Sequence, residues 1–343
     1  MSFKKEPFFS IIVPIRSLNR YFLQELIPAL SQQTYPHFEL IIISDKKEKP
    51  PKNLPEFVKF YLTGPDKGPA AKRDQGAALA QGNWLAFIDD DAYPAPTWLT
   101  NAACYHLQKN LAALCGPGLT PPGDSLARKA SGYFWSCPLF VSPSIARRAR
   151  SAPKTTLDDY PSFNLLVRQK DFQKIGGFNS QFWPGEDTKL CHDLAYHLGK
   201  KIIYDPEILV YHHRRAVFKE HLLQARRYAF QRGRFVALLP KTSLRPLYFL
   251  PTFFFLFIFL APPLILLLEL FSFCFLSLPL LALWLSLSFL YLSILILSSL
   301  PPAFQEKSPR FFFLLFSTAL VTHLNHAFFF TKGLLAKKAL RKL

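Results

Sequence analysis

The stretch WLAFIDDDAYP, residues 84–94, places three consecutive aspartates directly after five apolar residues. A short continuous apolar run of this kind is typical of a strand buried in a parallel sheet. Similar apolar runs occur at residues 8–14, 38–43 and 58–62, and segments with helical spacing lie between them at residues 21–31 and 68–80. The resulting order β-α-β-β-α-β predicts a three-layer α/β/α domain with a mostly parallel sheet.

Acidic side chains follow two of these predicted strands. Asp45 lies just beyond the run 38–43, and Asp89 to Asp91 follow the run 84–88. Ligands of open parallel sheets bind beyond the carboxyl ends of the strands, so we expect these acids to converge on one cleft. Alternate acids in an extended segment can share one hard divalent cation such as Mg²⁺ or Mn²⁺. A polar loop that caps the next helix is the alternative explanation.

The formal net charge of +18 over 343 residues fits either nucleic acid or anionic lipid head groups and phosphorylated substrates. Basic residues crowd against an apolar C-terminal region, at Arg214, Arg215, Lys219, Arg226, Arg227, Arg232, Arg234, Lys241 and Arg245. This position favours a membrane, and no nucleic-acid partner is expected. The five cysteines are scattered without a CxxC pair, so neither a disulfide framework nor a cysteine zinc site is predicted.

The region 247–331 contains three apolar segments, at residues 247–268, 272–300 and 311–330. A membrane-spanning helix needs about 20 such residues. We predict two transmembrane helices and a third segment that either spans the membrane or is re-entrant or interfacial. Buried helices of a large soluble core are the alternative, but such helices rarely run this long without a polar face.

The positive residues predict the orientation of the chain. They place residues 1–216, the expected folded domain, in the cytoplasm, and residues 217–246 read as a basic amphipathic helix at the membrane interface. Two spans would return residues 306–310 to the cytoplasm, whereas a third would put the basic tail 332–343 outside, against the rule. The start of the chain has no signal-peptide pattern. We therefore expect a multi-pass protein of the inner or plasma membrane.

Five segments of the N-terminal part follow one another in an informative order: FSIIVP at 9–14, the run 21–36, ELIIISD at 39–45, GPAAKRDQG at 68–76 and DDD at 89–91. Together they resemble family 2 glycosyltransferases of the GT-A fold. The resemblance extends over roughly residues 8–235. Within these five segments it departs from the family pattern at Asp74, which stands where the family usually has Asn.

The resemblance implies a donor site in this region. Asp89 and Asp91 would form the metal site for Mg²⁺ or Mn²⁺, with His212 as a further ligand, although lone histidines are more often structural. The residues implied in substrate binding here are Pro14, Asp45, Lys72, Arg73, Asp89 and Asp90. For Lys72 and Arg73, a solvated charge on a helix is the alternative.

The segment Gly185-Glu186-Asp187 opens a second helical pattern and resembles the catalytic-base motif of the family. A carboxylate there would accept the proton of an acceptor hydroxyl. We favour Asp187 as the base, with Glu186 as the near alternative, while acids in a first turn also simply complement the helix dipole. Asn164 lies in an acceptor-side segment, and Trp183 offers either a sugar-stacking face or core packing.

The segment QRGRF at 231–235 resembles the Gln-x-x-Arg-Trp motif of membrane-bound family members, with Phe235 in place of Trp. Gln231 and Arg234 would contact the substrate, and Arg234 could hold diphosphate oxygens. A lipid-facing basic helix is the alternative explanation.

The resemblance implies an inverting glycosyltransferase that moves a sugar from a nucleotide-diphosphate sugar to an acceptor hydroxyl of a lipid-linked or glycan acceptor, in cell-envelope glycan or glycolipid synthesis. Transfer to a polyprenyl phosphate and an inactive sugar-binding scaffold remain alternatives. A nucleotidyltransferase is disfavoured because residues 14–20 lack the expected glycine-rich loop.

Overall fold

The computed structural model describes residues 6–46, 54–64 and 67–336 of the chain. They form two compact units, which are described separately. The first unit comprises Met1–Gly123 and Arg147–His213, and the second comprises Asp124–Ala146 and Arg214–Leu343. The chain therefore enters the second unit twice.

The first unit is built on an eight-stranded sheet. Its strands, in spatial order, are β3 (Val58–Leu62), β2 (Phe38–Ser44), β1 (Phe9–Ile15), β4 (Trp84–Ile88), β9 (Asn164–Arg168), β6 (Leu111–Cys115), β10 (Lys201–Tyr204) and β8 (Thr155–Leu157). Strand β9 runs antiparallel to both of its neighbours, and β8 runs antiparallel to β10. The other neighbouring pairs are parallel, which confirms the predicted mostly parallel sheet.

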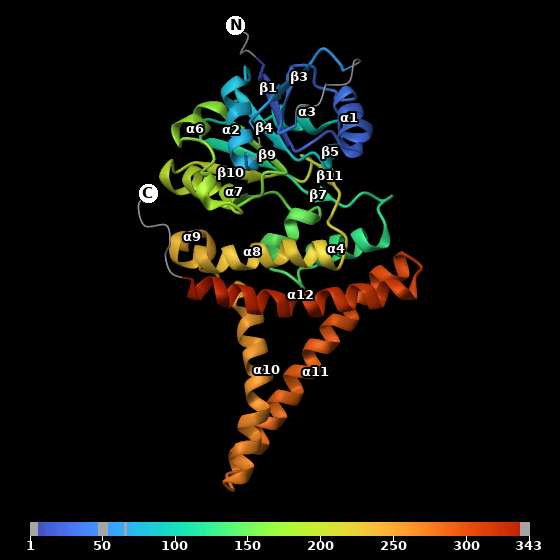
Figure 1. The fold of residues 1–343 in the computed structure, drawn as a ribbon, viewed down its shortest axis with the longest axis vertical. Helices are drawn as coiled ribbons and strands as arrows, with labels where there is room; N and C mark the ends of the chain where they lie inside the picture. Colours follow the sequence, from blue (N-terminus) through green and yellow to red (C-terminus); the bar gives the residue numbers. More distant parts are fainter. Residues whose placement is uncertain (1–5, 47–53, 65–66, 337–343) are drawn as a thin grey trace. The chain divides into compact units, whose positions relative to one another are not determined.

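Helices cover both faces of this sheet. Figure 1 shows α1 (Ile27–Ser31) and α3 (Trp98–Ala103) on one side, and α2 (Pro69–Leu79) and α6 (Gln169–Lys174) on the other. A π-helical turn, Phe22–Leu26, precedes α1. Because the chain leaves β1 toward one edge of the sheet and reaches β4 toward the other, the strand order reverses between these two strands. Such a switch point leaves a crevice beyond the carboxyl ends of the strands.

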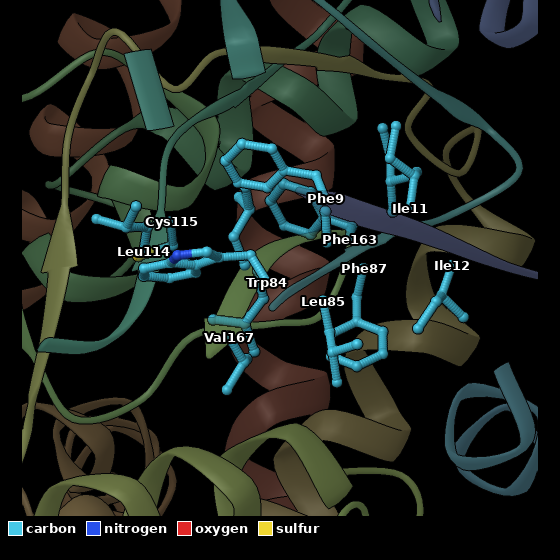
Figure 2. Packing of buried hydrophobic residues seen from close by; sticks show 14 of the residues in the cluster. Phe9, Ile11, Ile12, Trp84, Leu85, Phe87, Leu114, Cys115, Phe163 and Val167 are labelled. Carbon is cyan, nitrogen blue, oxygen red and sulfur yellow. The ribbon is translucent and has the colours of Figure 1, made fainter. Parts of the chain in front are cut away.

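The core of the first unit explains why its strands are apolar on both faces. Ile11 and Ile12 of β1 point to opposite faces of the sheet, Leu85 and Phe87 of β4 share one face, and all four are fully buried. Figure 2 shows these side chains packed together with Trp84. A strand covered by helices on both sides loses the polar alternation of a half-exposed strand, so the sequence pattern and the layering have the same cause.

A second, three-stranded sheet was not predicted. It has the order β5 (Ala92–Pro94), β11 (Val210–His212) and β7 (Gly118–Leu119). The antiparallel pairing of β11 with β5 sets His212 opposite Ala92. This register brings a histidine from late in the first unit next to the three aspartates.

The second unit is helical. Its helices are α4 (Leu126–Ser136), α5 (Pro143–Ala146), α8 (Lys219–Leu238), α9 (Pro240–Ser243), α10 (Pro246–Leu270), α11 (Cys274–Gln305) and α12 (Pro309–Leu335). Among the described residues, α10, α12 and the part of α11 from residue 275 are long and apolar enough to cross a membrane. Figure 1 shows α8 and α12 side by side, with α10 and α11 leading away from them.

Helices α8 and α12 touch through their backbones. A Cβ atom on Gly233 of α8 would lie 2.3 Å from the carbonyl oxygen of Phe330, and one on Gly333 of α12 would lie 2.1 Å from that of Phe230. Any larger side chain would clash with backbone that cannot move aside. Paired small residues allow this kind of close helix approach.

Buried hydrogen bonds hold α4 against the same pair of helices. His221 of α8 lies fully buried, with Nδ1 2.8 Å from Ser131 Oγ of α4 and Nε2 3.0 Å from Thr322 Oγ1 of α12. Burial lowers the pKa of His221 to about 4, so this imidazole is neutral at physiological pH. At the end of α11, Glu306 accepts a hydrogen bond from Lys129 Nζ of α4 at 2.6 Å.

Helix α10 is continuous although it contains proline residues in its interior. Pro262 has no N–H, so it cannot donate to the carbonyl of Ile258 one turn earlier. That oxygen instead accepts a hydrogen bond of 3.0 Å from Trp284 Nε1 of α11. The indole thus satisfies a carbonyl that the proline leaves free and fastens α10 to α11.

Candidate active site

Asp89, Asp91 and His212 meet at the carboxyl end of β4. One ligand atom from each lies within 4.8 Å of the others, and His212 Nε2 is 3.2 Å from Asp91 Oδ1. The His212 ring packs against Phe163 with a centroid separation of 4.7 Å. Two carboxylates and one imidazole form a donor set that suits Mn²⁺, or Mg²⁺ with retained waters. The three residues predicted as metal ligands are therefore brought together.

Asp90 has a different environment from its two neighbours. Its Oδ2 atom accepts a hydrogen bond of 2.6 Å from Asn19 Nδ2, and Asn19 Oδ1 in turn accepts the backbone N–H of Phe22 at 2.9 Å. The side chain of Asp90 therefore fixes the start of the π-helical turn that precedes α1. The next residue, Asp91, accepts the backbone N–H of His213 at its carbonyl oxygen, at 3.0 Å.

Arg73 joins the group formed by Asp89, Asp91 and His212 to the second acidic motif. This buried guanidinium donates from NH2 to Asp89 Oδ1 at 2.7 Å and from NH1 to Glu186 Oε1 at 3.3 Å. A buried charge is costly unless it is paired, and here it is shared between two carboxylates. Arg73 is thus not the solvated helix charge that the sequence also allowed.

Lys72 is also buried and holds the other acid of the crevice. Its Nζ atom donates to Asp45 Oδ2 at 2.6 Å and to the carbonyl oxygen of Ile15 at 2.7 Å. The Oδ1 atom of Asp45 is buried and has no hydrogen-bond partner among the residues that the structure describes. Pro14 is the penultimate residue of β1 and is partly buried.

The motif Gly185-Glu186-Asp187 begins α7 (Glu186–His192), which continues as the π-helical turn η4 (Asp193–His197). Gly185 has a φ of 137°, a conformation that glycine adopts readily and other residues do not. Its N–H donates to Glu186 Oε2 at 2.9 Å. Glu186 is thus engaged by Arg73 and by its own backbone turn.

Asp187 has the electrostatics of a general base. Its burial, and then the charges of Glu186 and Asp159, raise its pKa to about 7. The backbone N–H of Thr188 donates to Asp187 Oδ1 at 2.8 Å and orients the carboxyl group. A carboxylic acid whose pKa is close to the working pH is partly ionised and still has a substantial affinity for a proton. The electrostatics of Asp187 therefore suit proton transfer.

Asp159 is a site residue that the sequence analysis missed. Its Oδ1 atom accepts a hydrogen bond of 2.8 Å from Thr188 Oγ1, and its Oδ2 atom accepts one of 3.0 Å from Arg148 NH2. It thereby anchors the first turn of α7 and contributes to the raised pKa of Asp187. The pair Asp158-Asp159 directly follows β8, so the argument from acids at strand ends could have found it.

Asp74 fills the position at which the resembled family usually has Asn. Its Oδ1 atom accepts the backbone N–H of Phe178 at 2.8 Å, a bond that the oxygen of an amide could also make. Burial raises the pKa of Asp74 to about 6. Gly177, with a φ of 76°, allows the chain to pass close to this carboxyl group.

The remaining predicted residues differ in their surroundings. Asn164 is fully buried, with Nδ2 2.7 Å from the carbonyl oxygens of Gly116 and Ile208, and its Oδ1 atom accepts from Trp98 Nε1 at 2.9 Å. These bonds give it a role in holding the two sheets together. Trp183 is 44% exposed and is therefore not a core residue.

Gln231 and Arg234 lie on α8, in the second unit, where Arg234 NH1 donates to Gln231 Oε1 at 3.1 Å. Their contact with substrate stays a prediction of the family resemblance. Phe235, which replaces the tryptophan of that motif, is buried.

Comparisons with known proteins agree with the resemblance found in the sequence. Residues 10–176 match the model of the family described as glycosyl transferase family 2. The pre-mycofactocin glycosyltransferase of Mycobacterium tuberculosis is 26% identical over 219 residues, which cover 62% of this chain and 44% of that protein. The glucosyl-dolichyl phosphate glucuronosyltransferase of Haloferax volcanii is 22% identical over 217 residues, covering 59% and 68%. The chain thus matches less than half the length of the first of these relatives.

One solved structure is similar over almost the whole chain. The mannosyltransferase PcManGT from Pyrobaculum calidifontis, in complex with GDP-Man and Mn²⁺, superposes with a TM-score of 0.53 and 16% identity, covering 98% of this chain and 89% of that one. At this identity the likeness concerns the fold, and it confirms the predicted GT-A architecture. The family match over residues 10–176, just under half of the chain, supports a family 2 glycosyltransferase.

Proposed function

We propose that the protein is an inverting glycosyltransferase that moves a sugar from a nucleotide-diphosphate sugar to an acceptor hydroxyl at a membrane surface, in the synthesis of a cell-envelope glycan or glycolipid. One observation carries the proposal: Arg73 bridges Asp89 of the metal-binding group and Glu186, the residue before Asp187. The groups for the donor diphosphate and for the acceptor proton are thereby held in one network.

The donor would bind at the carboxyl ends of β1, β2 and β4. The buried Oδ1 atom of Asp45 suits an N–H group of the nucleotide base, and Lys72 keeps this carboxylate in place. Asp89, Asp91 and His212 would hold Mg²⁺ or Mn²⁺, which when bound neutralises charge on the diphosphate. Arg73 keeps Asp89 oriented while this charge develops.

The acceptor would bind near the start of α7. Its hydroxyl oxygen forms the new bond to the anomeric carbon while the diphosphate leaves with the electrons of the old bond. The carboxylate of Asp187 accepts the hydroxyl proton, and Asp159 and Thr188 hold the turn that carries it. Attack from the face opposite the leaving group inverts the anomeric configuration. The exposed Trp183 stands next to this turn and could stack on a sugar.

A lipid-linked acceptor is supported by the second unit. Three apolar helices provide membrane association, and one relative is named for transfer involving glucosyl-dolichyl phosphate. A polyprenyl phosphate that itself acts as nucleophile is the second candidate. At neutral pH such a phosphate group is already largely ionised and needs no base, so the raised pKa of Asp187 favours a hydroxyl as the acceptor group.

For the membrane part, we propose that α10 and α11 cross the membrane as a hairpin and that α12 lies at its cytoplasmic interface beside α8. The mean hydropathy of the most apolar window is 2.5 in α10 and 2.4 in α11 but only 1.4 in α12, where 39% of the window is buried. This arrangement keeps the basic residues of α8 and the basic tail on one side, as the positive-inside rule requires.

The test is transfer by the full chain purified in detergent. We expect a panel of nucleotide sugars to reveal one donor that is turned over with Mg²⁺ or Mn²⁺ and not after chelation. Asp91→Ala should lose this activity, whereas the matched control Asp158→Asn, an acid outside the proposed machinery, should keep it. Undiminished transfer by Asp91→Ala would overturn the metal assignment.

A further inference from the structure

Three side chains of types that can bind metal ions meet at the end of the helix that begins with Glu186 and Asp187. They are His192, Asp193 and His197, and one ligand atom from each lies within 4.8 Å of the others. Asp193 Oδ1 is 3.2 Å from His192 Nδ1 and 3.0 Å from His197 Nδ1. This group is separate from Asp89, Asp91 and His212 and has no part in the proposed reaction.

The π-helical turn η4 is what brings the two imidazoles together. In an α-helix, residues five positions apart point about 140° away from each other around the axis. Here the N–H of Leu198 bonds to the carbonyl oxygen of Asp193, a π-type bond of 3.0 Å, and the chain widens. The ring centroids of His192 and His197 are consequently only 5.3 Å apart. Single π turns often occur at functional sites.

The carboxylate between the rings is oriented by a third residue. Asp193 is buried, and its Oδ2 atom accepts a hydrogen bond from Lys189 Nζ one turn earlier. Its Oδ1 atom is thereby directed toward both imidazoles, as outer partners orient ligating carboxylates in metal sites. The side chain of His197 is 62% exposed, so the group is open to solvent.

We propose that His192, Asp193 and His197 form a second metal site, which takes Zn²⁺ or a similar transition-metal ion rather than the hard ion of the active site. Two imidazoles and one carboxylate, with water as a fourth ligand, are a common zinc donor set. Metal–ligand bonds of about 2.0 Å place tetrahedral ligand atoms ~3.3 Å apart. The observed separations from Asp193 Oδ1, 3.0 and 3.2 Å, are close to this value.

Binding would change the tautomer of both rings. Without metal, each ring can donate its Nδ1 hydrogen to Asp193 Oδ1; with metal, both Nδ1 atoms become ligands and each neutral ring carries its hydrogen on Nε2. The charge of Lys189 on Oδ2 lowers the affinity, because it repels a dication. The bound ion would tie residue 192 to residue 197 and so fix the π turn at the end of α7.

The experiment uses Co²⁺ as a probe for the full chain in detergent, because tetrahedral Co²⁺ absorbs strongly in the visible range and octahedral Co²⁺ weakly. We expect one equivalent to give a strong visible band that Zn²⁺ abolishes. The band should persist in Asp91→Ala, which lacks the active-site ligand, and in the control His37→Ala. It should disappear in His197→Ala, and the rise in unfolding temperature with Zn²⁺ should disappear with it.

A further variant sharpens the test. Lys189→Met removes the competing cation and should bind Co²⁺ more tightly than the wild type. The proposal is overturned if no tetrahedral band forms, or if the band survives in His197→Ala. Because His197 is largely exposed, its loss should leave the fold intact, and an unchanged far-UV circular dichroism spectrum would verify this. Lost binding by a folded variant would then report on the metal ligand itself.

Discussion

Two aspartates of the first unit carry pKa values raised by burial, and their surroundings separate their roles. Asp187 shares its neighbourhood with two further acids, Glu186 and Asp159, and lies in the first turn of α7. Asp74 faces the backbone N–H of Phe178 and makes a structural bond. The first pKa therefore fits the proposed proton transfer, whereas the second reflects a carboxyl group whose charged form is costly to bury in the fold.

Asp187→Asn should abolish the base while preserving the geometry. We expect transfer to fall by roughly 10² to 10⁴, with donor binding retained. In the wild type the rate should rise with pH through about 7, where the Asp187 carboxyl group loses its proton, and then level off. Initial rates between pH 5.5 and 9 would show this, and a profile without an inflection near 7 would exclude Asp187 as the base.

Asp74→Asn should stabilise the protein above pH 6. The folded state raises this pKa from 3.8 to about 6, so the wild type loses stability as the pH rises from the lower value through the higher one. An amide keeps the bond to Phe178 and removes the titration. We expect a gain of roughly 1 to 2 kcal/mol at pH 8, allowing for partial solvent screening, and none at pH 3.5. Thermal melts at both pH values would measure it; an equal gain at both would contradict the explanation.

At the scale of elements, the contact between α8 and α12 depends on two glycines. Gly233→Ala would press a methyl group onto the Phe330 carbonyl oxygen, and Gly333→Ala onto that of Phe230. Either change should separate the helices and lower the unfolding temperature in detergent by several degrees, since overpacking costs about 1 to 3 kcal/mol. Gly123→Ala is the matched control, because its added Cβ meets no atom within 4 Å. Equal unfolding temperatures for all three variants would show that the close approach of α8 and α12 does not contribute to stability.

For the molecule as a whole, the hairpin topology predicts which side of the membrane each connection faces. In a background with all five cysteines replaced by serine, Phe271→Cys between α10 and α11 should react with a membrane-impermeant thiol reagent added to intact cells. Ser308→Cys, between α11 and α12, should react only after the cells are opened. Labelling of Ser308→Cys from outside would reverse the proposed orientation.

Features that depend on neighbouring residues in the sequence could be predicted, whereas features that depend on contacts between distant segments could not. The runs 38–43 and 84–88 became strands β2 and β4, because covering both faces of a sheet leaves a local apolar signature. The pairing of His212 with Ala92 has no such signature, since it joins segments 120 positions apart. The family resemblance supplied His212 where the pattern alone did not. Arg73 as a bridge between Asp89 and Glu186 also required the folded chain.

The discontinuous second unit has a practical consequence for producing the catalytic unit alone. A chain ended at residue 213 would keep residues 124–146, and would lose the helical residues, such as Phe311 and Leu315, that pack with Ala130 and Phe134. We expect this shortened chain to aggregate. Replacing residues 124–146 with a short Gly/Ser loop as well should yield a monodisperse species on size-exclusion chromatography. Truncation at one end cannot produce the first unit alone, because residues 124–146 of the second unit are inserted between its two segments.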